Sequence, residues 1–284
     1  MKEQTIIDQT AHPVTVARIA HDLRQLGIRP GDTVLVHSSL SSLGWVCGGA
    51  QAAIQGLMQA VGVGAHTGEH TEGTLVMPAQ SGDWSDPAKW ENPPIPGKWI
   101  DIIYKEMPAY EPALTPTRGM GRIAEMFRTW PGTRRSGHPQ VSFCANGKHA
   151  ERIVADHPLT PQFGMASPLG KLYHERAKVL LMGARFDTCT SLHLAEALVP
   201  NMPVMKMGTA MLENGQRVWK WFTDFAYDSE DFANIGAAFE REGTVICGKV
   251  GNADCKLFDI AAAVDFAVKW LGEHRLKQEN GAWA

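Results

Sequence analysis

Strand and helix signals follow one another most clearly in Lys178-Val-Leu-Leu-Met-Gly-Ala-Arg-Phe-Asp-Thr-Cys-Thr-Ser-Leu-His-Leu-Ala-Glu196. The opening apolar run predicts a buried strand, and the small residues after it predict a turn. Thr190 or Ser191 then offers an N-cap for a helix that carries His193 and Glu196. Side chains three residues apart share a helix face, so the imidazole and the carboxylate should lie side by side at the carboxyl end of a strand.

This histidine–glutamate pair has two interpretations on spacing alone. A base beside a carboxylate and two hydroxyls, at the strand ends where open α/β sheets place their sites, indicates a catalytic site. A capped helix whose half-buried histidine bonds to the glutamate is the alternative, because such pairs also occur on solvated helices.

The composition of the 284-residue chain is that of a globular protein with a substantial core, because 44% of its residues are hydrophobic. A net charge of −3 gives no general attraction to nucleic acid or to an anionic membrane surface. No apolar run approaches the roughly 20 residues needed to span a bilayer, and the start of the chain lacks the apolar region of a signal peptide. The five cysteines form no Cys-x-x-Cys pair, which favours a reduced, cytoplasmic protein with free thiols.

Helical and strand patterns alternate along the rest of the chain and predict an α/β fold. Apolar positions and capping residues predict helices over residues 16–26, 51–61, 121–130, 148–157, 229–242 and 258–270. Short apolar runs predict further strands over residues 33–37, 74–78, 141–144 and 244–250. Residues 204–209 and 216–223 are predicted to pair as a hairpin across Glu213-Asn-Gly215, because Asn-Gly favours tight turns.

The domain organisation predicted from this pattern is simple. No repeat, low-complexity run or clear linker interrupts it, so residues 1–284 should form one α/β domain. Its central sheet should be mixed because of the late hairpin, and helices should flank it. Residues 79–118 carry many prolines and tryptophans and little periodicity, which predicts a long irregular insertion. An insertion of that length in a compact domain is usually functional.

Metal and phosphate motifs are weak in this sequence. His66 and His70 have the spacing of a helical metal-binding pair, but the glycines around them favour a solvated loop. The His-Glu-x-x-His pattern is absent, and His193 with Glu196 supplies too few ligands for a closed zinc site, so no metal is expected. Gly48-Gly49 opens onto a predicted helix and suits either a tight turn or anion binding.

Longer blocks of the sequence resemble the aminoglycoside 3-N-acetyltransferase family. They lie in order from about residue 15 to residue 270 and so cover nearly the whole chain. The blocks are Val36-His-Ser-Ser-Leu40, Trp84 to Trp99, Thr115 to Pro139, Ser167-Pro-Leu-Gly170 and Thr190 to Glu196. The resemblance implies an α/β fold with a mixed central sheet, unrelated to the fold of the common acetyltransferases.

The resemblance implies transfer of an acetyl group from acetyl-CoA to the 3-amino group of the 2-deoxystreptamine ring of aminoglycoside antibiotics, which confers resistance. It also implies that His193 is the general base and that Glu196 orients it or faces the substrate. Thr190 or Ser191 is a candidate for steadying the oxyanion of the thioester, by its hydroxyl or by its backbone N–H. The residues that the resemblance assigns to CoA are Ser38, Ser39, Leu40, Ser41, Arg118, Met120, Gly121 and Arg122.

A histidine suits acetyl transfer to an amine. An ammonium has no lone pair, so the amine must lose a proton before or during attack on the thioester carbonyl. The ordinary pKa of histidine, about 6.5, matches that task near neutral pH. The amine can attack directly within a ternary complex, so no covalent acyl-enzyme is required, and Cys189 is the one competing nucleophile.

An aminoglycoside carries several positive charges, so its pocket requires carboxylates, whereas the CoA side requires cations. Trp84, Trp90 and Trp99 could pack over sugar rings or anchor the loop instead. Many relatives have His-Asp-Ser/Asn where this chain has Phe186-Asp-Thr188, which leaves the range of acceptors open. The candidate carboxylates, for each of which an ordinary surface charge is the alternative, are Asp83, Asp86, Glu111, Asp187, Glu196 and Asp224.

Other functions remain open at this level. An acetyltransferase of the same family could act on a different amine. A hydrolase could use Ser38 or Ser191 with His193, although the sequence has no Gly-x-Ser-x-Gly motif. A binding protein without chemistry is a further alternative, and the intact His193 argues against it. The sequence leaves the oligomeric state open.

Overall fold

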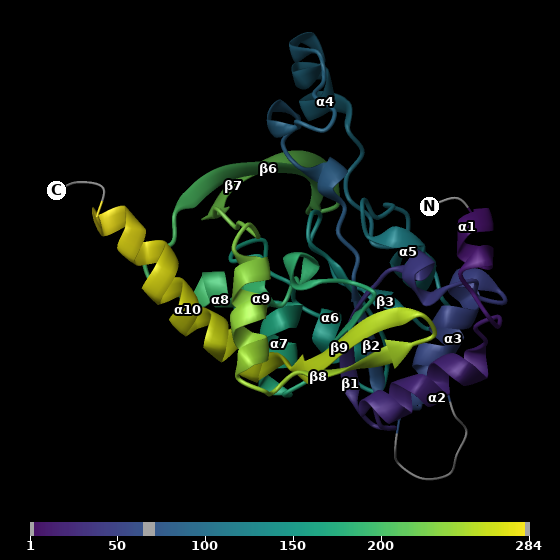
Figure 1. The fold of residues 1–284 in the computed structure, drawn as a ribbon. Helices are drawn as coiled ribbons and strands as arrows, with labels where there is room; N and C mark the ends of the chain where they lie inside the picture. The colour runs from purple at the N-terminus through teal and green to yellow at the C-terminus, as the bar shows by residue number, and fades with distance from the viewer. Residues whose placement is uncertain (1–2, 65–71, 282–284) are drawn as a thin grey trace.

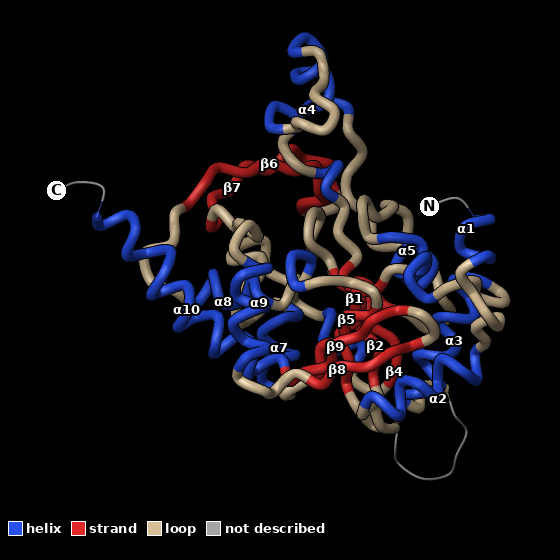
Figure 2. The backbone as a smooth tube through the Cα atoms, viewed as in Figure 1, coloured by secondary structure: helices blue, strands red, loops and turns tan. Residues whose placement is uncertain are grey.

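A seven-stranded sheet runs through the centre of the protein (Figures 1 and 2). The computed structural model describes the backbone of residues 3–64 and 72–281 and side chains as far as Arg275. The strand order in the sheet is β3-β4-β2-β1-β5-β9-β8. These strands are β1 (Thr33–Ser38), β2 (Thr74–Pro78), β3 (Arg134–Arg135), β4 (Phe143–Gly147), β5 (Lys178–Met182), β8 (Ile246–Val250) and β9 (Ala253–Asp259).

The sheet is mixed, as predicted, but the predicted reason is wrong. Strand β1 runs parallel to β2 and β5, whereas β4 and β9 run antiparallel to the strands beside them. The predicted hairpin does form, as β6 (Val204–Glu213) and β7 (Gln216–Phe225), but it makes a separate two-stranded sheet. Asn214 and Gly215 have φ angles of 52° and 77° at its turn, as a tight two-residue turn requires. The mixed character of the central sheet therefore comes from β4 and β9.

Strand β9 has no counterpart among the predicted strands. Its residues alternate between buried Ala253 and Cys255 and the more exposed Asp254 and Lys256. That alternation is typical of a half-buried strand, whereas the apolar runs of β1, β2 and β5 belong to strands buried on both faces. Strand β9 pairs with β8 across Gly251-Asn252. A search for continuous apolar runs therefore misses it.

Helices cover both faces of the sheet, because side chains of the buried strands alternate in direction. In β1, Val34 and Val36 belong to the core that α2, α3 and α5 cover, whereas Leu35 belongs to the core on the opposite face, with α6 to α10. The helices are α1 (Glu3–Asp8), α2 (Val16–Leu26), α3 (Gly49–Val61), α4 (Ile100–Glu106), α5 (Gly121–Arg128), α6 (Ala150–Val154), α7 (Pro168–His174), α8 (Leu192–Leu198), α9 (Phe232–Arg241) and α10 (Ile260–Gly281).

Helix α2 shows how the local sequence fixes the bounds of a helix. Thr15 Oγ1 accepts a hydrogen bond from the backbone N–H of Arg18 at 3.2 Å, which caps the first turn. Gly27, at φ 116°, closes the last turn by donating its N–H to the carbonyl of Arg24 at 3.2 Å. The bounds of α2 are those predicted. The other predicted helices are confirmed with different ends, and α1, α4 and α7 are additional.

Residues 79–118 are less irregular than predicted. They contain α4 and three short 3-10 helices, η2 (Gly82–Trp84), η3 (Pro87–Lys89) and η4 (Gly97–Trp99). Helix α4 projects above β6 and β7 in Figure 1, and the segment rests on that hairpin. Arg217 Nε donates to the carbonyl of Met107 at 2.9 Å, and the rings of Tyr104 and Trp219 lie 4.7 Å apart. These contacts with a partner distant in sequence order a segment that has little periodicity of its own.

Two of the three indoles in this segment anchor it. Trp84 Nε1 donates to the carbonyl of Pro108 at 3.0 Å, and Trp90 Nε1 donates to Ser85 Oγ at 2.9 Å. Trp99 is different, because 49% of its surface is exposed. The anchoring alternative therefore describes Trp84 and Trp90.

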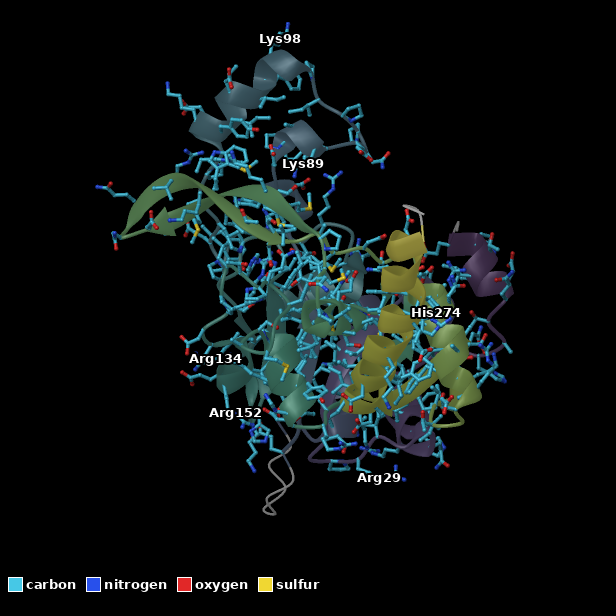
Figure 3. All side chains as sticks on the ribbon, turned by 90° about the vertical axis from the view of Figure 1, so that its left-hand side faces the viewer. Arg29, Lys89, Lys98, Arg134, Arg152 and His274 are labelled. Atoms are coloured by element: carbon cyan, nitrogen blue, oxygen red, sulfur yellow. The ribbon has the colours of Figure 1, made fainter. Side chains whose placement is uncertain are left out.

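The basic side chains labelled in Figure 3 are spread over the surface and do not form one patch. Lys89 and Lys98 lie at the end of the molecule that carries α4, and Arg29 and Arg152 lie at the opposite end. In the described ranges, 3–64 and 72–281, no helix is both long and apolar enough to cross a membrane. No three His, Cys, Asp or Glu side chains of these ranges form a set that could hold a metal ion. His66 and His70 lie outside the described residues.

Two histidines, the buried His138 and the largely buried His157, are held in their neutral form chiefly by burial, and in His138 the bonds accepted at Nδ1 contribute. His138 Nδ1 accepts from the backbone N–H groups of Gln140 and the residue after it, each at 3.1 Å, so a proton on that nitrogen would break both bonds. His157 Nε2 donates to the carbonyl of Gln162 at 2.8 Å, and its Nδ1 lies 2.9 Å from Ser136 Oγ. Burial lowers the pKa of His138 to about 3 and the pKa of His157 to about 4.

We expect the free energy of unfolding to decrease as the pH falls from about 7.5 to about 5. Both pKa values lie below the ordinary value of about 6.5, so the unfolded chain binds more protons than the folded one in this range. The stabilisation is therefore fully present above about pH 6.5 and is lost toward pH 4, by roughly 2 kcal/mol per histidine at pH 5. Urea denaturation at both pH values measures the loss. His157→Gln should show a smaller pH dependence, and equal dependence in both proteins would contradict the assignment.

Candidate active site

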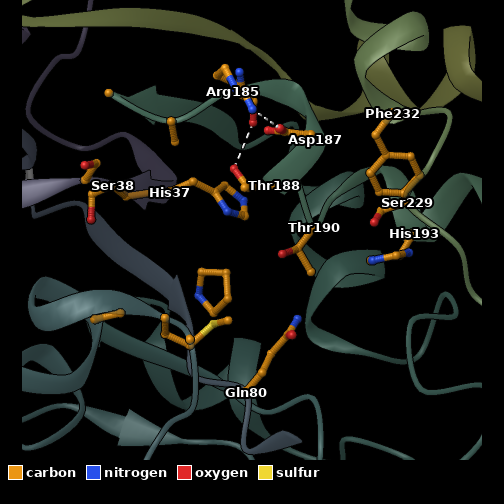
Figure 4. A pocket seen from close by; sticks show the side chains of 18 residues that line it. His37, Ser38, Gln80, Arg185, Asp187, Thr188, Thr190, His193, Ser229 and Phe232 are labelled. Carbon is orange, nitrogen blue, oxygen red and sulfur yellow. Dashed lines mark hydrogen bonds and ion pairs between the residues drawn. The ribbon is translucent and has the colours of Figure 1, made fainter. Parts of the chain in front are cut away.

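A pocket of about 520 Å³ lies at the carboxyl ends of β1 and β5 (Figure 4). These neighbouring strands are parallel, with Ser38 opposite Met182, so the segments that follow them leave the sheet side by side. Gly183 follows β5 with φ 65°, and a Cβ added there would lie 2.4 Å from Cβ of Ser42. Only glycine permits this close approach.

The pocket wall combines polar and apolar side chains from β1, from the end of β2, from the start of α5, from the segment after β5, from α8 and from the start of α9. The residues that line it are Val36, His37, Ser38, Ser39, Pro78, Gln80, Gly119, Met120, Ala124, Gly183, Ala184, Arg185, Asp187, Thr188, Thr190, His193, Ser229 and Phe232. Of the predicted site residues, the structure brings Ser38, Ser39, Met120, Asp187, Thr190 and His193 together around this pocket.

His193 and Glu196 meet on α8 as their spacing predicts. His193 Nδ1 lies 2.6 Å from Glu196 Oε2, and a carboxylate can only accept, so the imidazole donates from Nδ1. The other ring nitrogen, Nε2, then carries a lone pair. Figure 4 shows the His193 side chain pointing into the pocket, near Thr190. The arrangement presents a basic nitrogen to whatever occupies the pocket.

Glu196 lies behind the histidine and is completely buried. Its second oxygen, Oε1, accepts from the backbone N–H of Asp228 at 2.9 Å and from Arg275 Nη1 at 2.5 Å. Both carboxylate oxygens are therefore bonded, as a buried charge requires. Glu196 consequently serves the orientation of His193 and does not line the pocket.

Aromatic rings fix the plane of the imidazole. The ring of Phe163 is stacked on His193 with centroids 4.7 Å apart and an interplanar angle of 12°. Tyr227 presents its edge at 5.7 Å, and Phe232 packs at 4.8 Å. These contacts and the bond to Glu196 leave His193 with 17% of its side chain exposed, on the side of the pocket. The ring is therefore held in one orientation.

A second imidazole, His37, stands in the pocket wall at the end of β1. Burial, and then the proximity of His193, lower the pKa of His37 to about 4, so it is neutral at physiological pH. Its Nε2 is buried and has no hydrogen-bond partner among the described residues. An unbonded buried nitrogen in a ligand-sized pocket indicates that a polar ligand completes the wall.

The predicted N-cap of α8 is wrong in its chemistry. Ser191 occupies the N-cap position, but its side chain makes no capping bond, and its Oγ lies 3.1 Å from Cys189 Sγ instead. The backbone satisfies the first turn, because the N–H groups of Leu192 and His193 donate to the carbonyls of Cys189 and Thr190, each at 3.1 Å. The Thr190 side chain is left to line the pocket.

Most of the residues predicted to bind CoA lie in the main pocket, in a hollow next to it and in the short helix after β1. A hollow of about 550 Å³ shares Gly119 and Met120 with the main pocket and is also lined by Gly121 and Arg122. Leu40 and Ser41 form part of the 3-10 helix η1 (Leu40–Leu43), which follows the serines at the end of β1. The pocket and the hollow lie side by side at Gly119 and Met120.

Arg118 and Asp83, predicted for different ligands, meet in this structure. They form an ion pair, and Arg118 Nη2 also donates to the carbonyl of Asn92 at 3.0 Å. Both side chains line a smaller hollow of about 290 Å³ next to η2. Asp187 Oδ2 is paired with Arg185 at 2.6 Å in the main pocket, and its Oδ1 is buried without a partner among the described residues.

Besides Asp83 and Glu196, three further candidate carboxylates lie away from the lining of the main pocket. Asp224 is buried and accepts from the backbone N–H groups of Gln162 and Phe225, each at 2.8 Å. Asp86 caps η3 and accepts from the hydroxyl of Tyr104 at 2.7 Å. Glu111 is exposed in the segment after α4. The structure gives Asp224 and Asp86 a role in holding the backbone.

The site also contains residues that the sequence pattern did not point to. Phe163, Tyr227, Phe232 and Arg275 surround the histidine–glutamate pair from segments far from it in the chain. No local motif identifies these four residues, because aromatic and basic residues with similar neighbours in sequence occur throughout the chain. His37, by contrast, belongs to a polar run at a strand end, which is a detectable signal.

The mixed sheet with flanking helices that carries this pocket is the fold of known aminoglycoside acetyltransferases. The chain belongs to the aminoglycoside 3-N-acetyltransferase family, whose model matches residues 35–272. It is 49% identical to the SPbeta prophage-derived aminoglycoside N(3')-acetyltransferase-like protein YokD of Bacillus subtilis, over 94% of this chain and 95% of YokD. It is 36% identical to aminoglycoside N(3)-acetyltransferase IX of Micromonospora chalcea, over 98% of this chain and all of that protein (100%).

Solved structures of this family have the same fold. The crystal structure of YokD matches with a TM-score of 0.92 and 48% identity, covering 96% of this chain and 99% of that one. The AAC-IIIb complex with CoASH matches with a TM-score of 0.78 and 32% identity, covering 92% and 97%. The structure of AAC-VIa bound to sisomicin matches with a TM-score of 0.80 and 30% identity, covering 93% and 99%.

Proposed function

We propose that this chain transfers the acetyl group of acetyl-CoA to the 3-amino group of the 2-deoxystreptamine ring of aminoglycosides, and so confers resistance to them. The names of its relatives and the sisomicin complex of AAC-VIa support this acceptor. The five cysteines are free thiols, which supports a reducing compartment such as the cytoplasm. The observation that carries the proposal is the His193–Glu196 pair, which presents a basic nitrogen to a polar pocket.

The adjoining pocket and hollow fit acetyl-CoA, which would supply an activated acetyl group. The two spaces adjoin at Gly119 and Met120, which line both, and this supports an extended ligand that runs from one to the other. Arg122 is exposed beside them and has no hydrogen bond or ion pair within residues 3–64 and 72–281, so it is free to meet a phosphate. Helix α5 begins at Gly121 without a side-chain cap, and its first N–H groups favour an anion.

His193 acts as the general base in this proposal. Its Nδ1–H is committed to Glu196, so the proton of the acceptor amine passes to Nε2 as the amine attacks the acetyl carbonyl. The C–S bond of the thioester then breaks, and CoA leaves as its thiolate, which takes up that proton. Thr190 lines the same pocket and would steady negative charge on the carbonyl oxygen. Asp187 Oδ1, buried and without a partner among the described residues, would pair with a protonated amino group of the acceptor.

Direct transfer in a ternary complex is favoured over a covalent acyl-enzyme. Cys189 is completely buried, and burial raises the pKa of its thiol to about 11, so little thiolate exists near neutral pH. The hydrolase alternative has a similar difficulty. Ser191 Oγ bonds to Cys189, and in the described part of the chain neither Ser38 nor Ser191 donates a hydrogen bond to His193.

Thiol release from acetyl-CoA over a panel of aminoglycosides, with mass and NMR mapping of the acetylated nitrogen, tests the proposed function. We expect turnover with 2-deoxystreptamine compounds and acetylation at N3. Acetylation of other amines only would support the same-family alternative. An acyl-enzyme burst with an activated ester would support the hydrolase alternative.

We expect Arg118→Ala to raise the dissociation constant of acetyl-CoA about tenfold, because a charged hydrogen bond to a phosphate contributes roughly 1.5–3 kcal/mol. Asp83→Asn is the matched control. It removes the carboxylate that pairs with Arg118, so the guanidinium becomes available and acetyl-CoA should bind at least as tightly as to the parent protein. Calorimetry measures both constants. Unchanged affinity in Arg118→Ala would mean that Arg118 holds residues 79–118 in place instead.

A further inference from the structure

Arg275 reaches the catalytic pair from the last helix of the chain. It lies on α10, and only 17% of its side chain is exposed. Its Nη1 donates to Glu196 Oε1 at 2.5 Å, its Nε donates to Asp231 Oδ2 at 2.9 Å, and its Nη2 donates to the carbonyl of Asp228 at 3.0 Å. Three acceptors thus hold the planar guanidinium in one orientation.

These contacts form a continuous chain of hydrogen bonds from α10 to the pocket. Arg275 bonds to Glu196 Oε1, and Glu196 Oε2 bonds to His193 Nδ1. The backbone N–H of Asp228 also donates to Oε1, at 2.9 Å. Since Glu196 is fully buried, water is not available to replace a lost donor at this carboxylate. The charge of the carboxylate is therefore shared between the imidazole, one backbone amide and Arg275.

We infer that Arg275 is a positioning residue that fixes Glu196 and keeps His193 in its neutral, proton-accepting form. The inference rests on the proposed role of His193 as the base. A guanidinium at Oε1 offsets the carboxylate charge that would otherwise favour an imidazolium at Oε2. Arg275 therefore extends the pH range over which the base is free toward lower pH.

Other charged and titratable groups also face the pair. His37 lies on the pocket side, and its burial, followed by its proximity to His193, lowers its pKa to about 4, so it is neutral. The Tyr227 ring meets the imidazole, and burial raises the pKa of its hydroxyl far above the usual range. Asp231 is paired with Arg275. Arg275 is thus the cation that directly contacts Glu196 among the described residues.

The dependence of kcat/KM on pH tests this inference. The relevant part is the acidic limb, where activity falls as His193 takes up a proton. In Arg275→Met, Glu196 loses its cation, protonation of His193 becomes more favourable, and the limb should move to higher pH by roughly one unit. Activity at pH values on that limb then falls about tenfold, because one pH unit corresponds to a factor of ten. Arg275→Lys retains the charge without the planar fork and should shift the limb less. Arg18→Met removes an exposed arginine that pairs with Asp22 and should leave the profile unchanged.

Two further measurements separate this inference from a merely structural role and from failure of the proposed function. In a Glu196→Gln background, Arg275→Met should no longer shift the limb, because the carboxylate through which it acts is gone. An NMR titration of the His193 ring, assigned with His193→Ala, should move in the same direction without any acetyl transfer. An unchanged titration in a folded Arg275→Met protein would overturn the inference and leave Arg275 as an anchor of α10. Absence of aminoglycoside acetylation by the parent protein would instead contradict the proposed function, whatever the titration shows.

Discussion

Replacing His193 with alanine should lower turnover by roughly two to four orders of magnitude, which is the usual contribution of a positioned general base. The acceptor amine must lose a proton, and the imidazole is the basic group that the structure holds in the pocket with a free ring nitrogen and a bonded partner behind it. His37 is a poor substitute, because a pKa of about 4 makes it a weak base at neutral pH. Thiol release under saturating acetyl-CoA and aminoglycoside measures the effect.

The dissociation constant of acetyl-CoA should change little in His193→Ala, because the imidazole faces the amine and not the nucleotide in the proposed arrangement. His21→Ala removes an exposed histidine from α2 and should retain the parent turnover. A small loss of turnover in His193→Ala, comparable with that of His21→Ala, would refute the assignment of the base. Loss of both turnover and acetyl-CoA binding would indicate damage to the pocket rather than removal of a base.

The local half of the site could be predicted from the sequence. His193 and Glu196 are three residues apart, and the helix period places them on one face without any tertiary information. The strand before them is an apolar run, so its carboxyl end is also predictable. The pairing observed at 2.6 Å therefore follows from local rules.

The distant half of the site could not be predicted in this way. Arg275 bonds to Glu196 across 79 residues of sequence, and Phe163 stacks on His193 from a segment without regular structure. Their positions depend on how α8, α9 and α10 pack, and no single segment encodes that packing. Asp224 is a candidate for the pocket because it is a carboxylate, but it is buried and accepts hydrogen bonds from two backbone N–H groups. The sequence alone does not distinguish these two roles, because they depend on burial in the folded protein.

The fold shows the same division between local and distant information. Strands β1, β2 and β5 are buried on both faces, and their continuous apolar runs identify them. Strand β9 alternates, and its neighbours in the sheet are set by pairing with β5 and β8. The hairpin β6–β7 has a clear turn signal, but that signal gives no information on whether the hairpin joins the central sheet.

Removing the carboxylate of Glu196 should have the second large effect. Glu196→Gln leaves the shape of the side chain but replaces a charged acceptor of the imidazole N–H, so turnover should fall by roughly two to three orders of magnitude. The Michaelis constant for the acceptor should also rise, since a misoriented imidazole no longer meets the amine. Asp187→Asn should differ in kind. It should chiefly raise the acceptor Michaelis constant, because Asp187 lines the pocket beside Arg185 and lies outside the hydrogen-bond chain behind His193.

The effects of Glu196→Gln and Asp187→Asn can be distinguished by measuring how the parent enzyme responds to ionic strength. Asp187 is partly exposed, so salt screens its attraction for a cationic acceptor, and higher ionic strength should mimic Asp187→Asn in the parent protein. The fully buried Glu196 is screened far less, so salt should not reproduce the loss of turnover in Glu196→Gln. Asp254→Asn, which removes an exposed carboxylate paired with Lys249, is the matched control and should alter neither turnover nor the acceptor Michaelis constant.

Neutral alcohols of similar shape should not be acetylated, because no carboxylate–cation pairing would hold them. A protein that leaves every 2-deoxystreptamine compound unmodified at millimolar concentration, yet acylates or hydrolyses uncharged acceptors, would exclude the proposed substrate class even if His193 proved to be the base.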